Sequence, residues 1–288
     1  PNVGAALIVS LGCEGTDHER MVEEIRAAGK PVEIIRIQEL GGTSRAIQAG
    51  IDAAQRLVQE ISGLQRETVD ISEVVMAIKC GASDTTSGMA SNCVIGYVAD
   101  KLVDLGATVV FGETTEFLGG EHILAKRAVG GENGPIGQKI YEIVDRMEKR
   151  AKSVGEDMRG GQPTPGNIAG GLSSIEEKSL GAIVKSGHRP IQGVLEYCDR
   201  VDGQKGLWIK DAPGREPEIL TGMAATGAQF MMFSTGRGAP QGFPSMPVIK
   251  ICGNPHTYER MQHDMDLNAG RIIQGEKTIE EVGEEAFR

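Results

Sequence analysis

The sequence has 288 residues, of which 40% are hydrophobic, and this length accommodates one large domain or two modest domains with a substantial core. The formal net charge is −10, which argues against the basic face that a nucleic-acid partner requires. An apolar run of about 18 residues, the minimum for a membrane span, does not occur, and no signal peptide is visible. The five cysteines are scattered without a CxxC pair. We therefore expect a reduced, cytoplasmic protein with no nucleic-acid and no membrane partner.

Short apolar runs with the length and β-branched content of strands alternate along the chain with segments of helical periodicity. Strands are predicted at 5–10, 32–37, 74–78, 107–111, 229–234 and 248–252, and helices at 17–28, 44–61, 94–105 and 137–151. This alternation predicts an α/β fold, with mostly parallel sheets flanked by helices in Rossmann-like units.

A Gly- and Pro-rich stretch at 152–171 interrupts this pattern and predicts two α/β units, 1–160 and 161–288, which either are separate domains or share one continuous sheet. The second unit is expected to contain a helix at 174–185, a segment of undetermined type at 190–217, and a βαβ-like stretch at 218–252. The chain opens without Met directly before a strand-like run, which suggests a fragment or a processed subunit.

Most of the predicted strands end in a glycine-rich polar loop. These loops lie at 11–15, 79–88, 112–116, 234–238 and 252–256. Because ligands bind outside the carboxyl ends of strands in open parallel sheets, we expect the loops to form one shared cleft.

The loop at 79–88 carries Ser83, Asp84 and Ser87 directly before a predicted helix. Its small residues would let backbone N–H groups approach a substrate carboxylate or phosphate, although Ser and Asp at this position are also ordinary helix caps. The Walker spacing and its lysine are missing, so this loop is not a P-loop.

An acidic cluster follows the predicted strand at 107–111. It contains Glu113, Glu116, Glu121 and His122, with no Lys or Arg between them. Carboxylates with one imidazole suit Fe²⁺, Mn²⁺ or Mg²⁺ better than structural zinc, and Cys13, at another strand end, is a possible soft ligand. The alternative is that Glu121 complements a helix dipole while the other carboxylates are solvated.

Two further segments carry charged candidates. Glu177 and Lys178 follow Ser173 and Ser174 in overlapping capping boxes, so their pattern is explained by helix capping unless one of them faces the cleft. Thr235 and Arg237 end the strand at 229–234, where an arginine between glycines can present its planar fork to a carboxylate; the alternative is an exposed turn arginine.

Four segments, GASDTTSGMASN, GETTEFLGGEHILAKRA, GNIAGGLSSIEEKSLGAI and FSTGRGAPQG, together resemble the altronate/galactarate dehydratase family. The resemblance runs in order over nearly the whole chain. It implies a lyase that uses a divalent metal, Fe²⁺ or Mn²⁺, to dehydrate altronate or galactarate to a 2-keto-3-deoxy acid. The large subunit of 3-sulfolactate sulfo-lyase is a close relative, which makes sulfite elimination to give pyruvate the alternative reaction.

For this reaction, the candidate residues have the following hypothetical roles. Glu113, Glu121 and His122, with Cys13, would bind the metal; Glu116 or Glu177 would remove the C2 proton; and Lys178 would assist the leaving group. The substrate would be held by Ser83, Asp84, Ser87, Asn92, Thr235 and Arg237. Ala82 stands where the family has glycine, and Cys93 follows Asn92 where proline is usual.

Full-length members of the family carry a further upstream region, so we expect a small partner subunit resembling their N-terminal domain, in addition to homo-oligomers. A rival prediction from another functional class is a non-catalytic module or fragment that only binds a sugar acid. An NAD-dependent oxidoreductase is disfavoured because GxGxxG is missing after the first strand.

Overall fold

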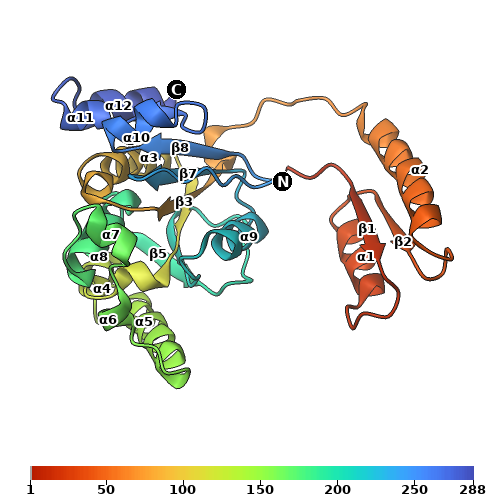
Figure 1. The fold of residues 1–288 in the computed structure, drawn as a ribbon, viewed down its shortest axis with the longest axis horizontal. Helices are drawn as coiled ribbons and strands as arrows, with labels where there is room; N and C mark the ends of the chain where they lie inside the picture. The colour runs from red at the N-terminus through yellow and green to blue at the C-terminus, as the bar shows by residue number, and fades with distance from the viewer. Residues whose placement is uncertain (1) are drawn as a thin grey trace. The chain divides into compact units, whose positions relative to one another are not determined.

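The computed structural model describes residues 2–288, which form two compact units, Asn2–Thr68 and Val69–Arg288. The smaller unit pairs β1 (Ala6–Ser10) in parallel with β2 (Val32–Arg36), connected by α1 (His18–Ala27) and followed by α2 (Thr43–Ile61) (Figure 1). The side chain of Asp17 caps α1 by accepting from the backbone N–H of Arg20. Ile35, Ala46 and Ala53 form the core of this unit.

The larger unit is built on a seven-stranded, entirely parallel sheet with the order β5–β6–β4–β3–β7–β8–β9. Its strands are β3 (Val75–Gly81), β4 (Thr108–Phe111), β5 (Ile191–Leu195), β6 (Gly206–Lys210), β7 (Phe230–Thr235), β8 (Val248–Cys252) and β9 (Leu267–Asn268). All the strands run the same way, so their carboxyl ends, with the loops that follow them, meet at one edge of the sheet.

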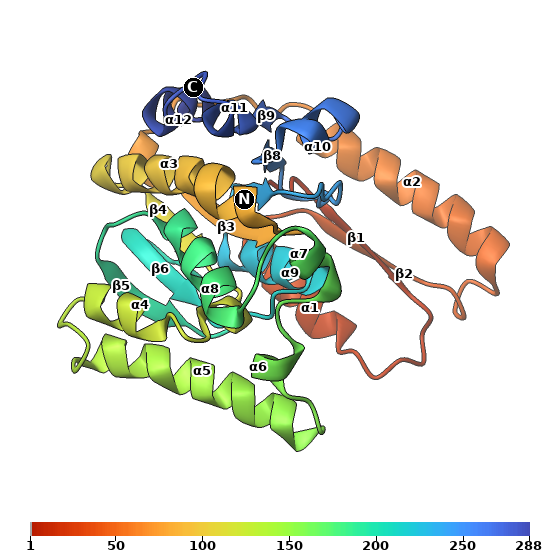
Figure 2. The ribbon, with the colours of Figure 1, turned by 60° about the vertical axis from the view of Figure 1, so that its left-hand side comes forward.

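Helices cover this sheet on both faces. They are α3 (Asn92–Asp104), α4 (Glu121–Arg127), α5 (Pro135–Ser153), α6 (Met158–Gly161), α7 (Pro165–Ala169), α8 (Ile175–Ile183), α9 (Glu216–Thr226), α10 (Pro255–Arg260), α11 (Gly270–Ile273) and α12 (Ile279–Phe287). Shorter helical turns are η1 (Ile71–Glu73), η2 (Ser87–Ser91), η3 (Thr114–Phe117) and η4 (Val184–Ser186). Helices α3 and α12 pack against each other, as do α4 and α5 (Figure 2).

Alternate residues of the strands β3, β4, β6 and β7 enter two separate cores, as the pleat of a strand requires. On β3, Met76 and Ile78 join the core that includes Val94 of α3, whereas Ala77 joins the core that includes Leu220 of α9. Both faces are therefore buried, which explains why the strands read as continuous apolar runs.

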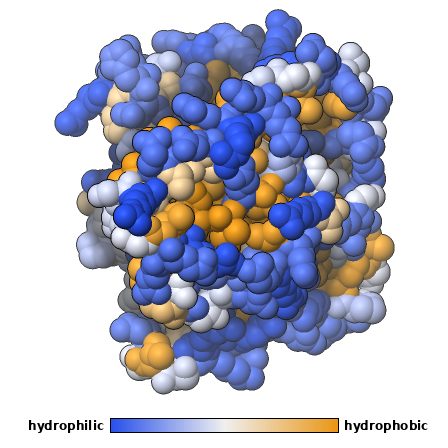
Figure 3. Space-filling model, turned by 90° about the vertical axis from the view of Figure 1, so that its right-hand side faces the viewer, coloured by the Kyte–Doolittle hydropathy of each residue, from blue (hydrophilic) through white to orange (hydrophobic). Residues whose placement is uncertain are grey.

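Figure 3 shows one face of the molecule, on which apolar groups gather at the centre of a polar surround. In the smaller unit, Ile47, Ile51 and Val58 of α2 are exposed. Along residues 2–288, no helix combines the length and the apolar character that a membrane span requires.

The parallel α/β architecture and all six predicted strands are confirmed, and so are the helices predicted at 17–28, 44–61, 94–105, 137–151 and 174–185. The segment at 190–217, which the sequence left undetermined, contains β5 and β6. The chain divides after Thr68 rather than near residue 160. Strands from both sides of 160 join one sheet, and the Gly- and Pro-rich stretch is a connection that carries α6 and α7.

Candidate active site

Five buried, chemically reactive side chains meet at the carboxyl ends of β3 and β4. They are Lys79, Cys80, Glu113, Glu116 and Lys185, and none is more than 7% exposed. We call this group the buried centre. Lys79 and Cys80 lie on β3, Glu113 and Glu116 come from the segment that leaves β4, and Lys185 comes from η4.

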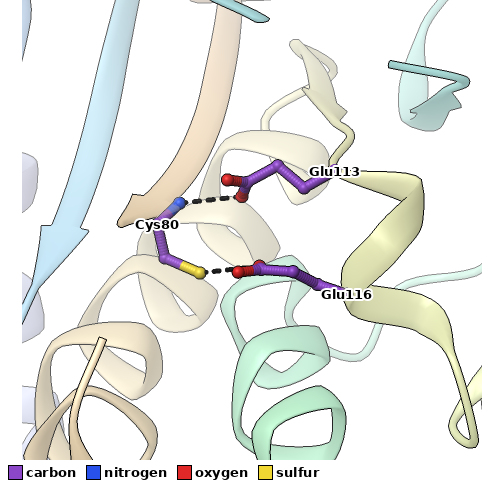
Figure 4. A group of neighbouring side chains, drawn as sticks. All are labelled: Cys80, Glu113 and Glu116. Atoms are coloured by element: carbon purple, nitrogen blue, oxygen red, sulfur yellow. Dashed lines mark hydrogen bonds between the residues drawn. The ribbon is translucent and has the colours of Figure 1, made fainter. Parts of the chain in front are cut away.

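Glu113 is bound by a cation from each face of the sheet. Its Oε1 accepts from Lys79 Nζ at 2.9 Å, and its Oε2 accepts from Lys185 Nζ at 2.7 Å. Oε2 also accepts from the backbone N–H of Cys80 at 2.9 Å (Figure 4). Glu113 reaches this position with φ 72°, in the left-handed region that a non-glycine residue rarely adopts. Backbone strain at a buried polar group is typical of a functional site.

Glu116 shares the second cation. Its Oε2 accepts from Lys185 Nζ at 2.7 Å and from the thiol of Cys80 at 2.9 Å (Figure 4). Lys185 Nζ also lies 3.1 Å from Cys80 Sγ. One ammonium therefore contacts both carboxylates and the sulfur.

This arrangement separates the pKa values of its members. Burial raises the pKa of Glu113, and the neighbouring Glu116 raises it further. Burial also opposes ionisation of Glu116, but the ammonium groups of Lys185 and Lys178 outweigh it and lower the pKa of Glu116 to about 2. Burial and Glu116 raise the pKa of the Cys80 thiol well above its usual range. At neutral pH, Glu116 is therefore a carboxylate and Cys80 a thiol.

The buried centre includes a group of donor atoms that could hold a metal ion. In residues 2–288, one atom from each of Cys80, Glu113 and Glu116 lies within 4.8 Å of the others. The ammonium of Lys185 contacts atoms of these same three side chains. As the side chains are placed, a metal ion bound to all three donors does not fit unless Lys185 moves away.

A cavity of about 560 Å³ opens beside the buried centre, at the same edge of the sheet. Its lining includes six of the residues that the sequence singled out: Ser83, Asp84, Ser87, Asn92, Glu177 and Lys178. The structure thus brings the loop after β3 together with α8, as a shared cleft requires.

Asp84 is fixed at the rim of this cavity by groups from several strand ends. Its Oδ1 accepts from the hydroxyl of Thr86 at 2.6 Å and from the N–H of Ser87 at 3.1 Å. Its Oδ2 accepts from Nδ2 of Asn254, which follows β8, at 3.0 Å. Gly236, which follows β7, packs so closely that a Cβ there would collide with the carboxylate. Three of the five predicted loops, those after β3, β7 and β8, therefore converge, whereas the loop at 11–15 belongs to the smaller unit.

Lys178 joins the cavity to the buried centre. Its Nζ donates to Gln162 Oε1 at 2.7 Å and to Asn167 Oδ1 at 3.1 Å, and its charge helps to lower the pKa of Glu116.

Asn92 adds a hydrogen-bond acceptor to the cavity. Its Nδ2 donates to the carbonyl of Gly181, whereas its buried Oδ1 accepts no hydrogen bond from the described part of the chain. A ligand hydroxyl could satisfy that oxygen.

Other candidates lie apart from these features. Glu121 and His122 begin α4 and are not in the group of possible metal donors found in residues 2–288, and His122 is exposed. They are separated from Glu116 by Phe117 and Leu118, which enter the core, and by a turn at Gly119 with φ 82°.

The remaining candidates have their own partners. Cys13 is exposed in the smaller unit, where its Sγ accepts from Gln38. Arg237 is exposed and donates to the carbonyl of Gly166, whereas buried Thr235 accepts from the N–H of Gly238. Glu177 accepts from the hydroxyl and the N–H of Ser173, which lower its pKa.

A second cavity, of about 670 Å³, lies between α5 and the loop after β6. The charged side chains lining it are largely paired with one another, since Arg146 binds both Asp211 and Glu196. Thr114 lines this cavity and donates a hydrogen bond to Asp211 at 2.6 Å. The smaller cavity is therefore the better candidate for a substrate.

The sequence interpretation missed Lys79, Cys80 and Lys185 as site residues. Both lysines carry a usable signal, because each lies within or at the end of an apolar run, VVMAIK and LGAIVK. A lysine that a strand or helix pattern forces into the core needs a buried anionic partner.

Comparison with known proteins places this site in a family. Residues 71–288 match the family described as D-galactarate/altronate dehydratase, C-terminal, and residues 1–62 match the second domain of D-galactarate dehydratase/altronate hydrolase. These limits agree with the division of the chain after Thr68.

The curated relatives include lyases of two kinds. The chain is 40% identical to the (2R)-sulfolactate sulfo-lyase subunit beta of Chromohalobacter salexigens, over 99% of this chain and 72% of that protein. It is 36% identical to the galactarate dehydratase (L-threo-forming) of Escherichia coli, over 100% of this chain and 55% of the relative. It is 34% identical to the altronate dehydratase of Bacillus subtilis, over 95% of this chain and 54% of the relative. The chain thus spans about half the length of these dehydratases and belongs to the D-galactarate/altronate dehydratase family.

Proposed function

We propose that this chain carries the active site of a lyase that removes the C2 proton of a 2-hydroxy acid and eliminates the substituent at C3. The first candidate substrates are the sugar acids altronate and galactarate, which would lose water to give a 2-keto-3-deoxy acid. The observation that carries the proposal is the cavity beside the buried centre, where hydroxyl, amide, carboxylate and ammonium groups converge. Membership of a family with dehydratase relatives supports the same reaction.

The lining of the cavity suits a polyhydroxylated anion. The ammonium of Lys178 would bridge the substrate carboxylate and the C3 hydroxyl, and the hydroxyls of Ser83 and Ser87 with Oδ1 of Asn92 would bind the other substrate hydroxyls. In this proposal Asp84 orients the loop after β3 and accepts a hydrogen bond from the substrate. Thr235 and Arg237 support the same edge of the sheet from the end of β7.

The elimination needs one base and one acid. We propose that Glu177 or Glu116 takes the C2 proton as the C2–H electron pair forms the C2=C3 bond. The C3 hydroxyl leaves as water with a proton from Lys178, and the resulting enol tautomerises to the 2-keto acid. Glu177 lines the cavity, whereas Glu116 is buried beside Lys178.

The resemblance also implies a divalent ion, Fe²⁺ or Mn²⁺, which when bound would stabilise the enediolate formed at C2. Since the Lys185 ammonium contacts the three donor side chains of the buried centre, we assign no step to an ion at that place. The proposed steps therefore involve no metal ion, and the activity assay is run with and without Fe²⁺ or Mn²⁺ to test whether one is required.

A second candidate is sulfite elimination from (2R)-sulfolactate, which would give pyruvate after the same C2 deprotonation. It is favoured by the identity of 40% over 99% of this chain to a relative named as a sulfo-lyase subunit beta. The word subunit in that name also supports a partner chain for this protein.

The two reactions are separated by their products. Altronate, galactarate and (2R)-sulfolactate are supplied in turn to the purified protein, with and without Fe²⁺ or Mn²⁺ and with a partner subunit, while 2-keto acid and sulfite are quantified. Sulfite with pyruvate identifies the sulfo-lyase, and a 2-keto acid without sulfite identifies the dehydratase. If calorimetry detects binding of a sugar acid and no product forms, the result would instead support the non-catalytic binding module. If neither product nor binding is found, the dehydratase, the sulfo-lyase and the binding module are all overturned.

A further inference from the structure

The buried centre holds a lysine where its donor group could hold a metal ion. Lys185 Nζ lies 2.7 Å from Oε2 of Glu113, 2.7 Å from Oε2 of Glu116 and 3.1 Å from Sγ of Cys80. These side chains supply the group of possible metal donors in residues 2–288. We propose that the ammonium of Lys185 is the resident cation of this centre and that it keeps divalent metal ions out.

Geometry is the first support for this assignment. Metal–oxygen and metal–sulfur bonds are about 2.0–2.3 Å long, so an ion bonded to all three donors would lie between them. The ammonium already approaches each of the three within hydrogen-bond distance. An ion in that position would sit closer to Nζ than contact distance allows, and the two like charges would repel each other.

The charge balance is the second support. The side chains of Lys79, Lys185, Glu113 and Glu116 are no more than 8% exposed, and their two ammonium charges match their two carboxylate charges; Glu216, partly exposed, lies 3.4 Å from Lys79 Nζ. A divalent ion added to this set would leave a net positive charge with little access to water. Desolvating unpaired charge is costly, so the ion could bind only if a lysine left.

The lysines are also held in place. Lys79 Nζ donates to Glu113 and to the carbonyls of Cys80 and Gly214, at 2.9, 2.8 and 3.2 Å, and it lies 4.8 Å from the ring centroid of Phe233. Lys185, a residue of η4, is fully buried. Neither ammonium can reach water without opening the packed edge of the sheet.

The inference deepens the proposed function but does not rest on it, because metal exclusion is a property of the resting protein. If the lyase requires Fe²⁺ or Mn²⁺, that ion would bind outside the buried centre. Lys185 then acts as a positioning residue that fixes the carboxylates of Glu113 and Glu116.

Co²⁺ is a suitable probe, because a thiolate bound to Co²⁺ gives a charge-transfer absorption that carboxylate ligands do not. Full-length protein and its Cys80→Ser variant are titrated with Co²⁺ without substrate, and the difference between them isolates Cys80 from the other four cysteines. We expect no Cys80-dependent band in the wild-type protein. A band of about one Co²⁺ per chain that disappears with Cys80→Ser would overturn the proposal, and this comparison needs no lysine variant to fold.

Lys185→Met tests the cause. It should create a Cys80-dependent Co²⁺ site, which Lys185→Met/Cys80→Ser should lack. Lys178→Met is the matched control, since it removes an ammonium from the same region without contacting the sulfur, and it should create no such band. A folded Lys185→Met protein that binds Co²⁺ no differently from the wild type would show that the ammonium is not what excludes the ion.

Discussion

Lys185 Nζ and Glu116 Oε2 lie 2.7 Å apart, with both side chains buried at the edge where β3 and β4 end. The pair connects two segments that are distant in the sequence, η3 and η4, and places a negative charge near Lys178, which lines the smaller cavity. Breaking this ion pair should therefore change both the stability of the larger unit and the rate of the proposed reaction.

Removing one partner of this pair should destabilise the protein strongly. Lys185→Met leaves two buried carboxylates without their shared cation, which typically costs about 3–5 kcal/mol. Urea unfolding followed by circular dichroism measures the loss. Combining Lys185→Met with Glu116→Gln should cost less than the sum of the single changes, because the double variant no longer buries an unpaired Glu116 charge. Arg200→Met, at the exposed pair with Asp202, is the control and should change stability little.

The pH dependence of stability should carry the signature of Glu116. Its folded pKa of about 2 lies below the ordinary glutamate value of 4.5, so its contribution is fully present above about pH 4.5. That contribution is lost as the pH falls from about 4.5 to about 2, because protonation then favours the unfolded chain. Urea midpoints measured across this window should fall less steeply for Glu116→Gln than for the wild-type protein. Equal slopes would show that Glu116 is not held ionised by Lys185.

Ala82→Gly should stabilise the protein. Ala82 is exposed and has φ 49°, a left-handed conformation that glycine adopts without strain, so about 1 kcal/mol should be gained with no packing lost. Thermal unfolding would show a higher midpoint. The control is Ala225→Gly, at an exposed position of α9, which should lower the free energy of unfolding by about 0.5–1 kcal/mol. If both variants are less stable than the wild-type protein, Ala82 is not strained.

Lys178→Met should weaken binding of the substrate carboxylate. A charged hydrogen bond of about 1.5–3 kcal/mol corresponds to a fall of roughly 10- to 100-fold in affinity, measured by calorimetry, with a similar or larger fall in kcat/KM. Lys149→Met on the exposed face of α5 removes the same charge far from the cavity lining and should leave both quantities unchanged. Equal affinity in the two variants would remove Lys178 from the site.

Gly236→Ala should displace Asp84. The added Cβ would collide with the Asp84 carboxylate, and relieving such a collision typically costs about 1–3 kcal/mol. We expect lower thermal stability together with reduced ligand affinity, since the loop after β3 must move. Gly242→Ala is the control because its Cβ would meet open space. An unchanged affinity with Gly236→Ala would mean that Asp84 does not shape the cavity.

Much of the architecture could be predicted from the sequence, because periodicity is a local property. The strands β3, β4, β7 and β8 follow from apolar runs, and their glycine-rich ends predicted a shared edge. The strands β5 and β6 were not predicted, since their short sequences, IQGVL and GLWIK, gain their pairing only from neighbours in the sheet. The division after Thr68 was missed for the same reason, as sheet membership is a long-range property.

The sequence by itself determined the acidic segment after β4 and the loop of small polar residues after β3, which together located the candidate site. Only the tertiary structure decided which acidic groups meet. Glu113 and Glu116 join Cys80, whereas a turn at Gly119 separates Glu121 and His122 from that group. It also decided that the Lys185 ammonium lies between these carboxylates. Lys185 belongs to a helical end 69 residues away from Glu116, so their spacing in the sequence does not predict the pair. Spacing along a chain records which groups are near in sequence, while burial and packing decide which charges must neutralise one another.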